Sequence, residues 1–327
     1  MENLRTNYLG LNLKSPVILG SSGLSKKIDN LKIAEKNGVG AIVLKSLFEE
    51  QINYESDKTI SQNLIDFHSA NDYILNYSKL NSLNEYADFI KRAKDAVSIP
   101  IIASINCSHN IEWGDFAERI ENAGADALEL NMNVLAFDAD KSASDIEEEY
   151  YQIAEHVKNS TKLNIACKLG NNFTNLPYFI KQLSFRGINS FVLFNKFFEP
   201  VIDIKKEAIK SSALFSTDTD IKQSIRKIAV TKGLLPDIEI SGSTGVHSAD
   251  GLIQQILAGA TTVQLCSVLY KKGVQEIGKI IEGLEKWMEE KSYSSIEDFR
   301  GKLSYCNIDN PQLYERYQFI KYFTSVE

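Results

Sequence analysis

Two lysines in this chain each follow a short apolar run, where a buried ammonium group is costly unless it has a partner. Lys168 comes after the run LNIAC, and Lys45 comes after AIVL. We expect Lys168 either to pair with a bound anion or to act as an amine with a lowered pKa. Lys45 is equally well explained as a strand-end lysine that extends its charge into solvent.

Asparagines stand in comparable places. Asn131 and Asn195 each end an apolar run, and Asn106 ends a third. An asparagine presents one acceptor and two donors, which suits the edge of a heterocycle such as a pyrimidine or a flavin ring. Each asparagine taken alone is also an ordinary turn residue. Two amides and two lysines at four such positions favour one shared ligand.

Small residues follow two further apolar runs near the C-terminus. Residues 238–240 stop at SGSTG (241–245), and residues 262–265 stop at Cys266-Ser267. Between them, residues 248–258 have the apolar spacing of a helix, and Gly259 stands where that helix should end. Loops of small residues at two consecutive strand ends aim several backbone N–H groups at one point. We therefore expect a phosphate site there.

Metal chemistry is not indicated. His109 and His247 lie just past strand ends, whereas His68 and His156 are expected to be structural or exposed. No two of the four histidines have the spacing of metal ligands. The four cysteines are widely separated and include no C-x-x-C pair. This excludes an obvious zinc or iron–sulfur framework and is typical of a reducing cytosol.

A repeated unit positions these residues. A helix end, a glycine and a short apolar strand with a polar end recur at residues 34–46, 120–131, 183–195 and 256–267. Four more apolar strands lie between these segments. Amphipathic patterns predict helices at roughly 28–37, 82–96, 113–123, 145–158, 175–186, 218–233, 248–258 and 274–290. Eight strand-then-helix units predict an α/β protein with a closed TIM (β/α)8 barrel, in which loops 7 and 8 commonly bind phosphate.

The barrel is expected to be residues 1–290, with residues 291–327 as a short C-terminal capping tail. An open doubly wound sheet would gather its glycines in one early loop, which the chain does not do. The spacers 47–81, 132–145 and 196–217 are long and are predicted to be loops on the catalytic face. Long loops at that face are more often lids than linkers.

The composition of the chain argues against some classes of binding partner. The formal net charge is −7 and no Lys/Arg cluster stands out, which argues against nucleic acid. No secretory signal is recognisable at the start, and no apolar run is long enough to span a membrane. We expect a cytoplasmic protein with a small-molecule substrate, and a homodimer stays open.

A phosphate site at strands 7 and 8, with lysines and amides at other strand ends, indicates a planar ligand with a phosphate tail. FMN fits this description. Lys168, Asn131 and Asn195 are then the expected catalytic residues, because a lysine near the pyrimidine part of the ring stabilises negative charge on it.

At these residues the chain resembles the dihydroorotate dehydrogenase family of FMN-dependent barrels. The matching pieces are SPVILGSSG (15–23), AIVLKS (41–46), ALELN (127–131), IACKLG (165–170), Asn195 and residues 240–269. The resemblance is to the soluble branch, which lacks the N-terminal helical segment of the membrane-attached branch. It implies an FMN site lined by Ser21, Ser22, Lys45, Ser46, Asn131, Lys168, Asn195, Gly242, Ser243, Thr244, Gly245, Cys266 and Ser267, to which the strand pattern adds Asn106.

The chain also departs from that family. The Cys or Ser that takes a proton from dihydroorotate in the family is replaced by Val134. The family's substrate loop is replaced by residues 55–77, and the strand-6 motif with its second asparagine becomes FNKFFEP (194–200). The glycine pair of the strand-7 loop becomes Thr244-Gly245. Any substitute base must come from another loop, with His109, Cys107, Tyr73 and Tyr77 as candidates.

Three functions follow as hypotheses. The first is an FMN-dependent dehydrogenase acting on CH–CH donors, with dihydroorotate or a related small heterocycle as substrate. The second is a phosphate-binding aldolase or isomerase in which Lys168 forms a Schiff base. The third is a flavin-binding paralogue that lacks dihydroorotate activity. The electron acceptor is not indicated by any motif.

Overall fold

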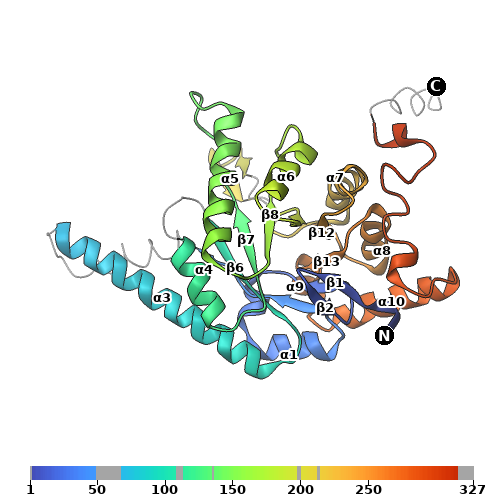
Figure 1. The fold of residues 1–327 in the computed structure, drawn as a ribbon, viewed down its shortest axis with the longest axis horizontal. Helices are drawn as coiled ribbons and strands as arrows, with labels where there is room; N and C mark the ends of the chain where they lie inside the picture. The colour runs from blue at the N-terminus through green and yellow to red at the C-terminus, as the bar shows by residue number, and fades with distance from the viewer. Residues whose placement is uncertain are drawn as a thin grey trace.

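Parallel strands close into a ring at the centre of the molecule (Figure 1). The computed structural model describes residues 2–48, 68–107, 113–134, 136–196, 200–211 and 214–315. The ring confirms the predicted (β/α)8 barrel, with helices between the strands. In order around it lie β3 (Val17–Leu19), β4 (Ala41–Val43), β6 (Ile101–Cys107), β7 (Ala127–Met132), β8 (Ile165–Leu169), β9 (Ser190–Leu193), β12 (Glu239–Gly242) and β13 (Thr262–Leu265), which pairs again with β3. A short β5 (Leu47–Phe48) adds to β6.

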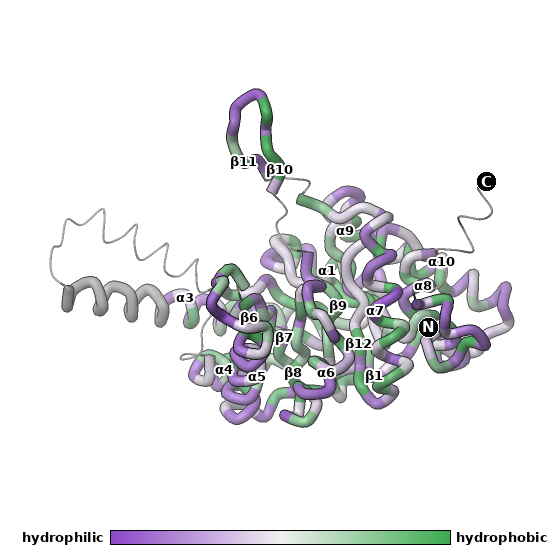
Figure 2. Tube along the Cα trace, turned by 90° about the horizontal axis from the view of Figure 1, so that it is seen from above, coloured by the Kyte–Doolittle hydropathy of each residue, from purple (hydrophilic) through white to green (hydrophobic). Residues whose placement is uncertain are grey.

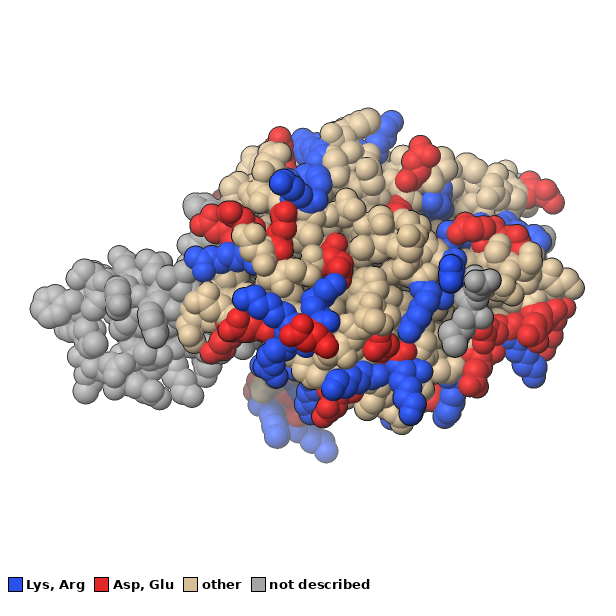
Figure 3. Space-filling model, turned by 60° about the horizontal axis from the view of Figure 1, so that its bottom comes forward, with Lys and Arg blue, Asp and Glu red and all other residues tan. Residues whose placement is uncertain are grey.

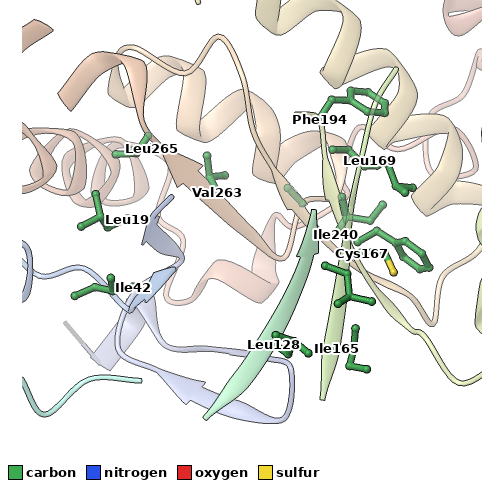
Figure 4. Packing of buried hydrophobic residues seen from close by; sticks show 14 of the residues in the cluster. Leu19, Ile42, Leu128, Ile165, Cys167, Leu169, Phe194, Ile240, Val263 and Leu265 are labelled. Atoms are coloured by element: carbon green, nitrogen blue, oxygen red, sulfur yellow. The ribbon is translucent and has the colours of Figure 1, made fainter. Parts of the chain in front are cut away.

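The strands are buried on both faces, which explains their near-continuous apolar sequences. Along β7, Leu128 and Leu130 belong to the large cluster that packs against the helices, whereas Ala127 belongs to a second cluster inside the barrel. On β8, Ile165, Cys167 and Leu169 likewise belong to the large cluster (Figure 4), whereas Ala166 between them belongs to the cluster inside the barrel. This period of two places every second side chain in the interior.

The helix that ends at Gly259 stops where the sequence predicts its cap, whereas Ser142 and Ser248 cap two helix starts that the sequence patterns do not identify. The hydroxyl of Ser142 accepts from the N–H of Asp145, and Ser248 caps the helix that ends at Gly259, whose φ is +121°. The helices are α1 (Ile28–Lys36), α3 (His68–Ala96), α4 (Trp113–Asn122), α5 (Ala143–Ser160), α6 (Leu176–Phe185), α7 (Ile221–Leu234), α8 (Ala249–Ala258), α9 (Ser267–Lys272) and α10 (Glu276–Glu290), with short 3₁₀ turns at Glu2–Leu4, Gly23–Lys26, Asp218–Asp220, Ile296–Asp298 and Pro311–Tyr314.

Two of the predicted catalytic-face loops contain regular structure. Helix α3 begins at His68, so the later part of spacer 47–81 is helical. The many Asn and Ser residues in this part of the spacer are typical of a loop. However, no Gly or Pro separates them from the amphipathic stretch that follows, so the helix continues through them. Spacer 196–217 contains an antiparallel hairpin of β10 (Pro200–Asp203) and β11 (Ala208–Ser211), which projects from the body (Figure 2).

A second hairpin, which the sequence patterns do not reveal, closes the N-terminal end of the barrel. It consists of β1 (Thr6–Tyr8) and β2 (Leu11–Leu13). The N–H of Leu9 donates to the Glu239 carboxylate at 2.8 Å, and the Asn164 amide donates to the Leu9 carbonyl, also at 2.8 Å. Tyr8, Leu9 and Leu13 form one cluster with the inward side chains of the strands. The hairpin is therefore the floor of the barrel.

The C-terminal segment after α10 packs back on the barrel. Ile296 and Phe299 are buried, and the N–H groups of Gly301 and Leu303 donate to the carbonyls of Ile256 and Leu257 on α8. The division at residue 290 stays a prediction. The described helices include none that is long and apolar enough to cross a membrane. On the face seen in Figure 3, acidic and basic side chains are intermingled.

If the hairpin is the floor, Leu13→Ala should lower the free energy of unfolding by about 2–5 kcal/mol, because the methyl groups it removes face a closed, well-packed interior. Urea denaturation measures this. Leu313→Ala is the control, since the Leu313 side chain is half exposed and should change stability by no more than about 0.5 kcal/mol. Equal effects of the two substitutions would contradict the role of the hairpin.

Candidate active site

A cavity of about 320 Å³ opens at the C-terminal ends of β8, β9, β12 and β13. Ligand cavities in proteins commonly measure about 300–1,000 Å³. Among the residues predicted from the sequence, those lining it are Ser21, Lys168, Asn195, Ser243, Thr244, Gly245, Cys266 and Ser267. The strand-end pattern therefore brings most of the predicted set to one place.

Lys168 is not an unpaired buried cation. Its Nζ lies 3.5 Å from Glu129 Oε1, and the two side chains are only 9% and 1% exposed. Lys168 also donates to Gln264 Oε1 at 3.3 Å, while Gln264 Nε2 donates to Glu129 Oε2 at 2.6 Å. The lysine, the amide and the carboxylate form one closed network, and Glu129 and Gln264 are site residues that the sequence patterns miss.

Serines connect the first three strands of the ring. Ser46 N–H donates to Ser21 Oγ at 3.0 Å, and the hydroxyls of Ser46 and Ser104 lie 2.8 Å apart. Ser104 is two residues before Asn106 on β6, so the period of two that places Asn106 inside the barrel also predicts Ser104 there. Tyr86 of α3 holds this strand from outside, because its hydroxyl accepts from Ser104 N–H at 2.8 Å.

Lys45 lies in a different cavity. It lines a space of about 550 Å³ between the end of β4 and α3, together with Ser46, Lys26 and Arg92. Burial and the neighbouring Lys26 lower the pKa of Lys45. Since Ser46 borders this second cavity and Ser21 borders the first, the bond between the two serines lies where the cavities approach each other. The two predicted lysines thus do not contact the same space.

The asparagines act together. Asn195 Nδ2 donates to Asn131 Oδ1 at 2.9 Å, so Asn131 supports the amide that lines the first cavity. Asn106 is opposite Asn131 in the pairing of β6 with β7, and its buried Oδ1 has no hydrogen-bond partner in the described part of the chain. Ser22, Asn106, Asn131 and Gly242 are not among the lining residues. Gly242 instead faces α8, where an added Cβ would lie 2.8 Å from Gln255 Oε1.

The loop after β12 has a left-handed backbone at two consecutive residues. Thr244 has φ +73° and Gly245 has φ +83°. Thr244 is strained there, but its hydroxyl donates to the Phe194 carbonyl at 2.8 Å and ties the loop to the end of β9. Gly245 lies against the first turn of α7, where a Cβ would come within 2.2 Å of the Ile221 nitrogen. This position therefore requires glycine.

Ser216 lines this end of the cavity and contacts His247, and the strand-end pattern does not identify Ser216. Its hydroxyl lies 3.1 Å from His247 Nε2 and accepts from Gly245 N–H at 3.3 Å. Burial and Lys271 lower the pKa of His247, so its ring is neutral at pH 7. No group of metal-ligating residues occurs among the described residues. His247 thus contacts Ser216, which in turn accepts from the loop after β12.

Cys266 and Val134 differ in whether their side chains carry a group that can exchange a proton. Burial raises the pKa of the Cys266 thiol, although nearby Lys168 opposes this, so Cys266 is a neutral thiol at pH 7. Val134 is buried, and its N–H donates to the Tyr150 hydroxyl at 3.1 Å. An aliphatic side chain at this position accepts no proton.

Residues 3–288 match the family model described as dihydroorotate dehydrogenase. The chain belongs to the dihydroorotate dehydrogenase family. Three similar proteins are each named dihydroorotate dehydrogenase B (NAD(+)), catalytic subunit. The one from Pyrococcus furiosus is 24% identical over 91% of this chain and 98% of its own length. Those from Methanocaldococcus jannaschii and Thermoplasma volcanium are both 26% identical, over 90% and 92% of this chain and 96% and 98% of theirs.

Low identity agrees with a divergent member of the dihydroorotate dehydrogenase family. The chain has the TIM-barrel fold of this family, whose members are oxidoreductases and generally use FMN. The departure at Val134 is now placed at the end of β7. Of the candidate replacement bases, His109 lies outside the described residues, as do the side chains of Cys107, Tyr73 and Tyr77.

Substituting Gly245 tests the geometry of the loop. Gly245→Ala should lower the free energy of unfolding by about 1–2 kcal/mol for the left-handed backbone and by about 1–3 kcal/mol more for overpacking against α7. Gly124→Ala is the matched control, because Gly124 has φ +91° and nothing within 4 Å of the added Cβ. Chemical denaturation of both variants measures the difference, and equal losses would show that the contact with α7 is not tight.

Proposed function

We propose that this protein is an FMN-dependent oxidoreductase that oxidises a CH–CH bond in dihydroorotate or a related small heterocycle. The observation that carries this proposal is the cavity at the ends of β8, β9, β12 and β13, which is lined by most of the predicted residues, in a chain of the dihydroorotate dehydrogenase family. Oxidation of such a bond removes a hydride and a proton and leaves a C=C bond.

The residues fit FMN at both ends of the cavity. The N–H of Thr244 and the hydroxyls of Ser243 and Ser267 would hold the phosphate, while Gly245 allows the loop to turn. Lys168, Asn195 and Ser21 would hold the ring, offering a cation, an amide and a hydroxyl to its polar edge. When bound, FMN would supply the hydride acceptor that no side chain provides.

The chain's own residues then have distinct tasks. Lys168 presents positive charge to the ring and is fixed by Glu129 and Gln264. Asn131 fixes Asn195. The larger cavity is lined by the basic residues Lys26, Lys45 and Arg92 and by the acidic residues Glu85 and Asp88, so a substrate carboxylate would have to bind on its basic side. The finer expectations of a cytoplasmic location and a homodimer belong to this proposal.

A Schiff-base aldolase is a poorer explanation of the same residues. Attack on a carbonyl needs a neutral, accessible amine. Lys168 is instead buried, and its Nζ is held between Glu129 and Gln264, so it does not offer an accessible amine. Val134, by contrast, supports a flavoprotein whose substrate is not dihydroorotate, because the family's base is absent from this position.

Comparing two flavins tests the cofactor assignment. The protein should bind FMN at least about 100-fold more tightly than riboflavin, because charge-assisted hydrogen bonds to the phosphate each contribute about 1.5–3 kcal/mol. Quenching of flavin fluorescence measures both affinities. Equal affinities would contradict the phosphate assignment, and a protein that takes up neither flavin would overturn the proposed function.

Restoring the family's base tests the substrate. If dihydroorotate binds as in the family, Val134→Cys should speed the anaerobic bleaching of bound FMN by dihydroorotate about 10²–10⁴-fold, the usual range for a positioned base. Stopped-flow absorbance measures the rate. Val134→Ala is the control, since it opens the same space without a proton acceptor. Equal rates in the two variants would favour another substrate or a base elsewhere.

A further inference from the structure

We infer that Glu129 is the internal counter-ion of Lys168 and thereby sets the reduction potential of bound FMN. The inference rests on the proposed function, because it needs FMN in the cavity that Lys168 lines. Glu129 is not among the residues that line this cavity. It is therefore a positioning residue that acts through Lys168 and not a catalytic residue.

Strand register places the two charges together. Glu129 and Asn131 are both inward residues of β7, and Asn131 is opposite Lys168 on β8. The lysine can therefore reach back toward the carboxylate, and its Nζ lies 3.5 Å from Glu129 Oε1. Both side chains are almost fully buried. A charge pair in such a place interacts strongly, since little water screens it.

Gln264 fixes the direction of this contact. Its amide donates to Glu129 Oε2 at 2.6 Å, and its carbonyl accepts from Lys168 at 3.3 Å. Glu129 Oε1 makes no hydrogen bond within the described part of the chain, so its compensation comes from the lysine. A buried carboxylate that lost this partner would be strongly destabilised.

The other groups near Glu129 do not replace the lysine. Tyr8 rises from the floor of the barrel, and burial, followed by the charge of Glu129, raises its pKa, so it is neutral. Glu239 has partners of its own, the Leu9 N–H and the Ser190 hydroxyl, the latter at 2.6 Å. Among the described residues, Lys168 is the cation at ion-pair distance from Glu129.

It follows that Lys168 does not present a full positive charge to the ring. The carboxylate cancels part of it from below. Removing that negative charge should leave the lysine's field less opposed and should stabilise extra electrons on the flavin, which raises the midpoint potential. Adding a negative charge to the network should lower it. These opposite signs separate an electrostatic role from a structural one.

The experiment is a redox titration of the FMN-loaded protein against a reference dye. Glu129→Gln should shift the flavin equilibrium toward the reduced side on the order of tenfold, which is about +30 mV for a two-electron couple. Gln264→Glu should shift the potential in the opposite direction. Glu239→Gln is the matched control, since it neutralises an inward carboxylate whose recorded partners are at the barrel floor and should leave the potential unchanged.

A double substitution tests whether the effect passes through the lysine. In a Lys168→Met background, Glu129→Gln should shift the potential much less than it does alone, because the group that transmits the effect is gone. Thermal melting identifies any variant that fails to fold, and Gln264→Glu then still gives a signed answer. FMN binding with an unchanged potential in both Glu129→Gln and Gln264→Glu would overturn the inference alone. No binding of FMN would overturn the proposed function and this inference with it.

Discussion

The buried contact between Lys168 and Glu129 depends on how the barrel interior changes along its axis. Inward positions near the floor are apolar, as at Ala127 and Ala166, whereas the next inward positions on the same strands are Glu129 and Lys168. The β1–β2 hairpin closes the barrel from below and keeps these charges away from water on that side. With little solvent present, the pair needs the complete network with Gln264, because partial satisfaction of buried polar groups is destabilising.

This layering also explains what the sequence could predict. Short apolar runs followed by polar residues indicated the strands and their catalytic ends, because parallel strands bring those ends to one edge. Lys168, Asn195 and the small residues after β12 and β13 were predicted in this way, and they line one cavity. Glu129 was not, since it lies within the strand ALELN, where a single acidic residue in an apolar run reveals neither its partner nor its direction. Strand register decides both, and register is set by the closed ring.

Other features were hidden for different physical reasons. The floor hairpin has strands of three residues each, too short for alternation to be recognised. Lys45 and Lys168 were expected to share a ligand because both end strands, but β6 and β7 separate β4 from β8 around the ring. A strand-end pattern predicts the height of a side chain in the barrel and not its angle around the axis. The two lysines therefore line different cavities.

Two departures from the family illustrate why its cofactor is easier to infer than its substrate. Thr244 replaces a glycine in a left-handed conformation that costs about 1–2 kcal/mol for a non-glycine residue, yet its hydroxyl bonds to the Phe194 carbonyl. The N–H groups of that loop belong to the backbone, so they persist whichever side chain is present. Proton removal, in contrast, depends on one side chain, and Val134 supplies none. A site that binds through backbone groups tolerates divergence, whereas a single-residue base does not. Divergence in this chain therefore bears more heavily on the molecule to be oxidised than on the proposed binding of FMN.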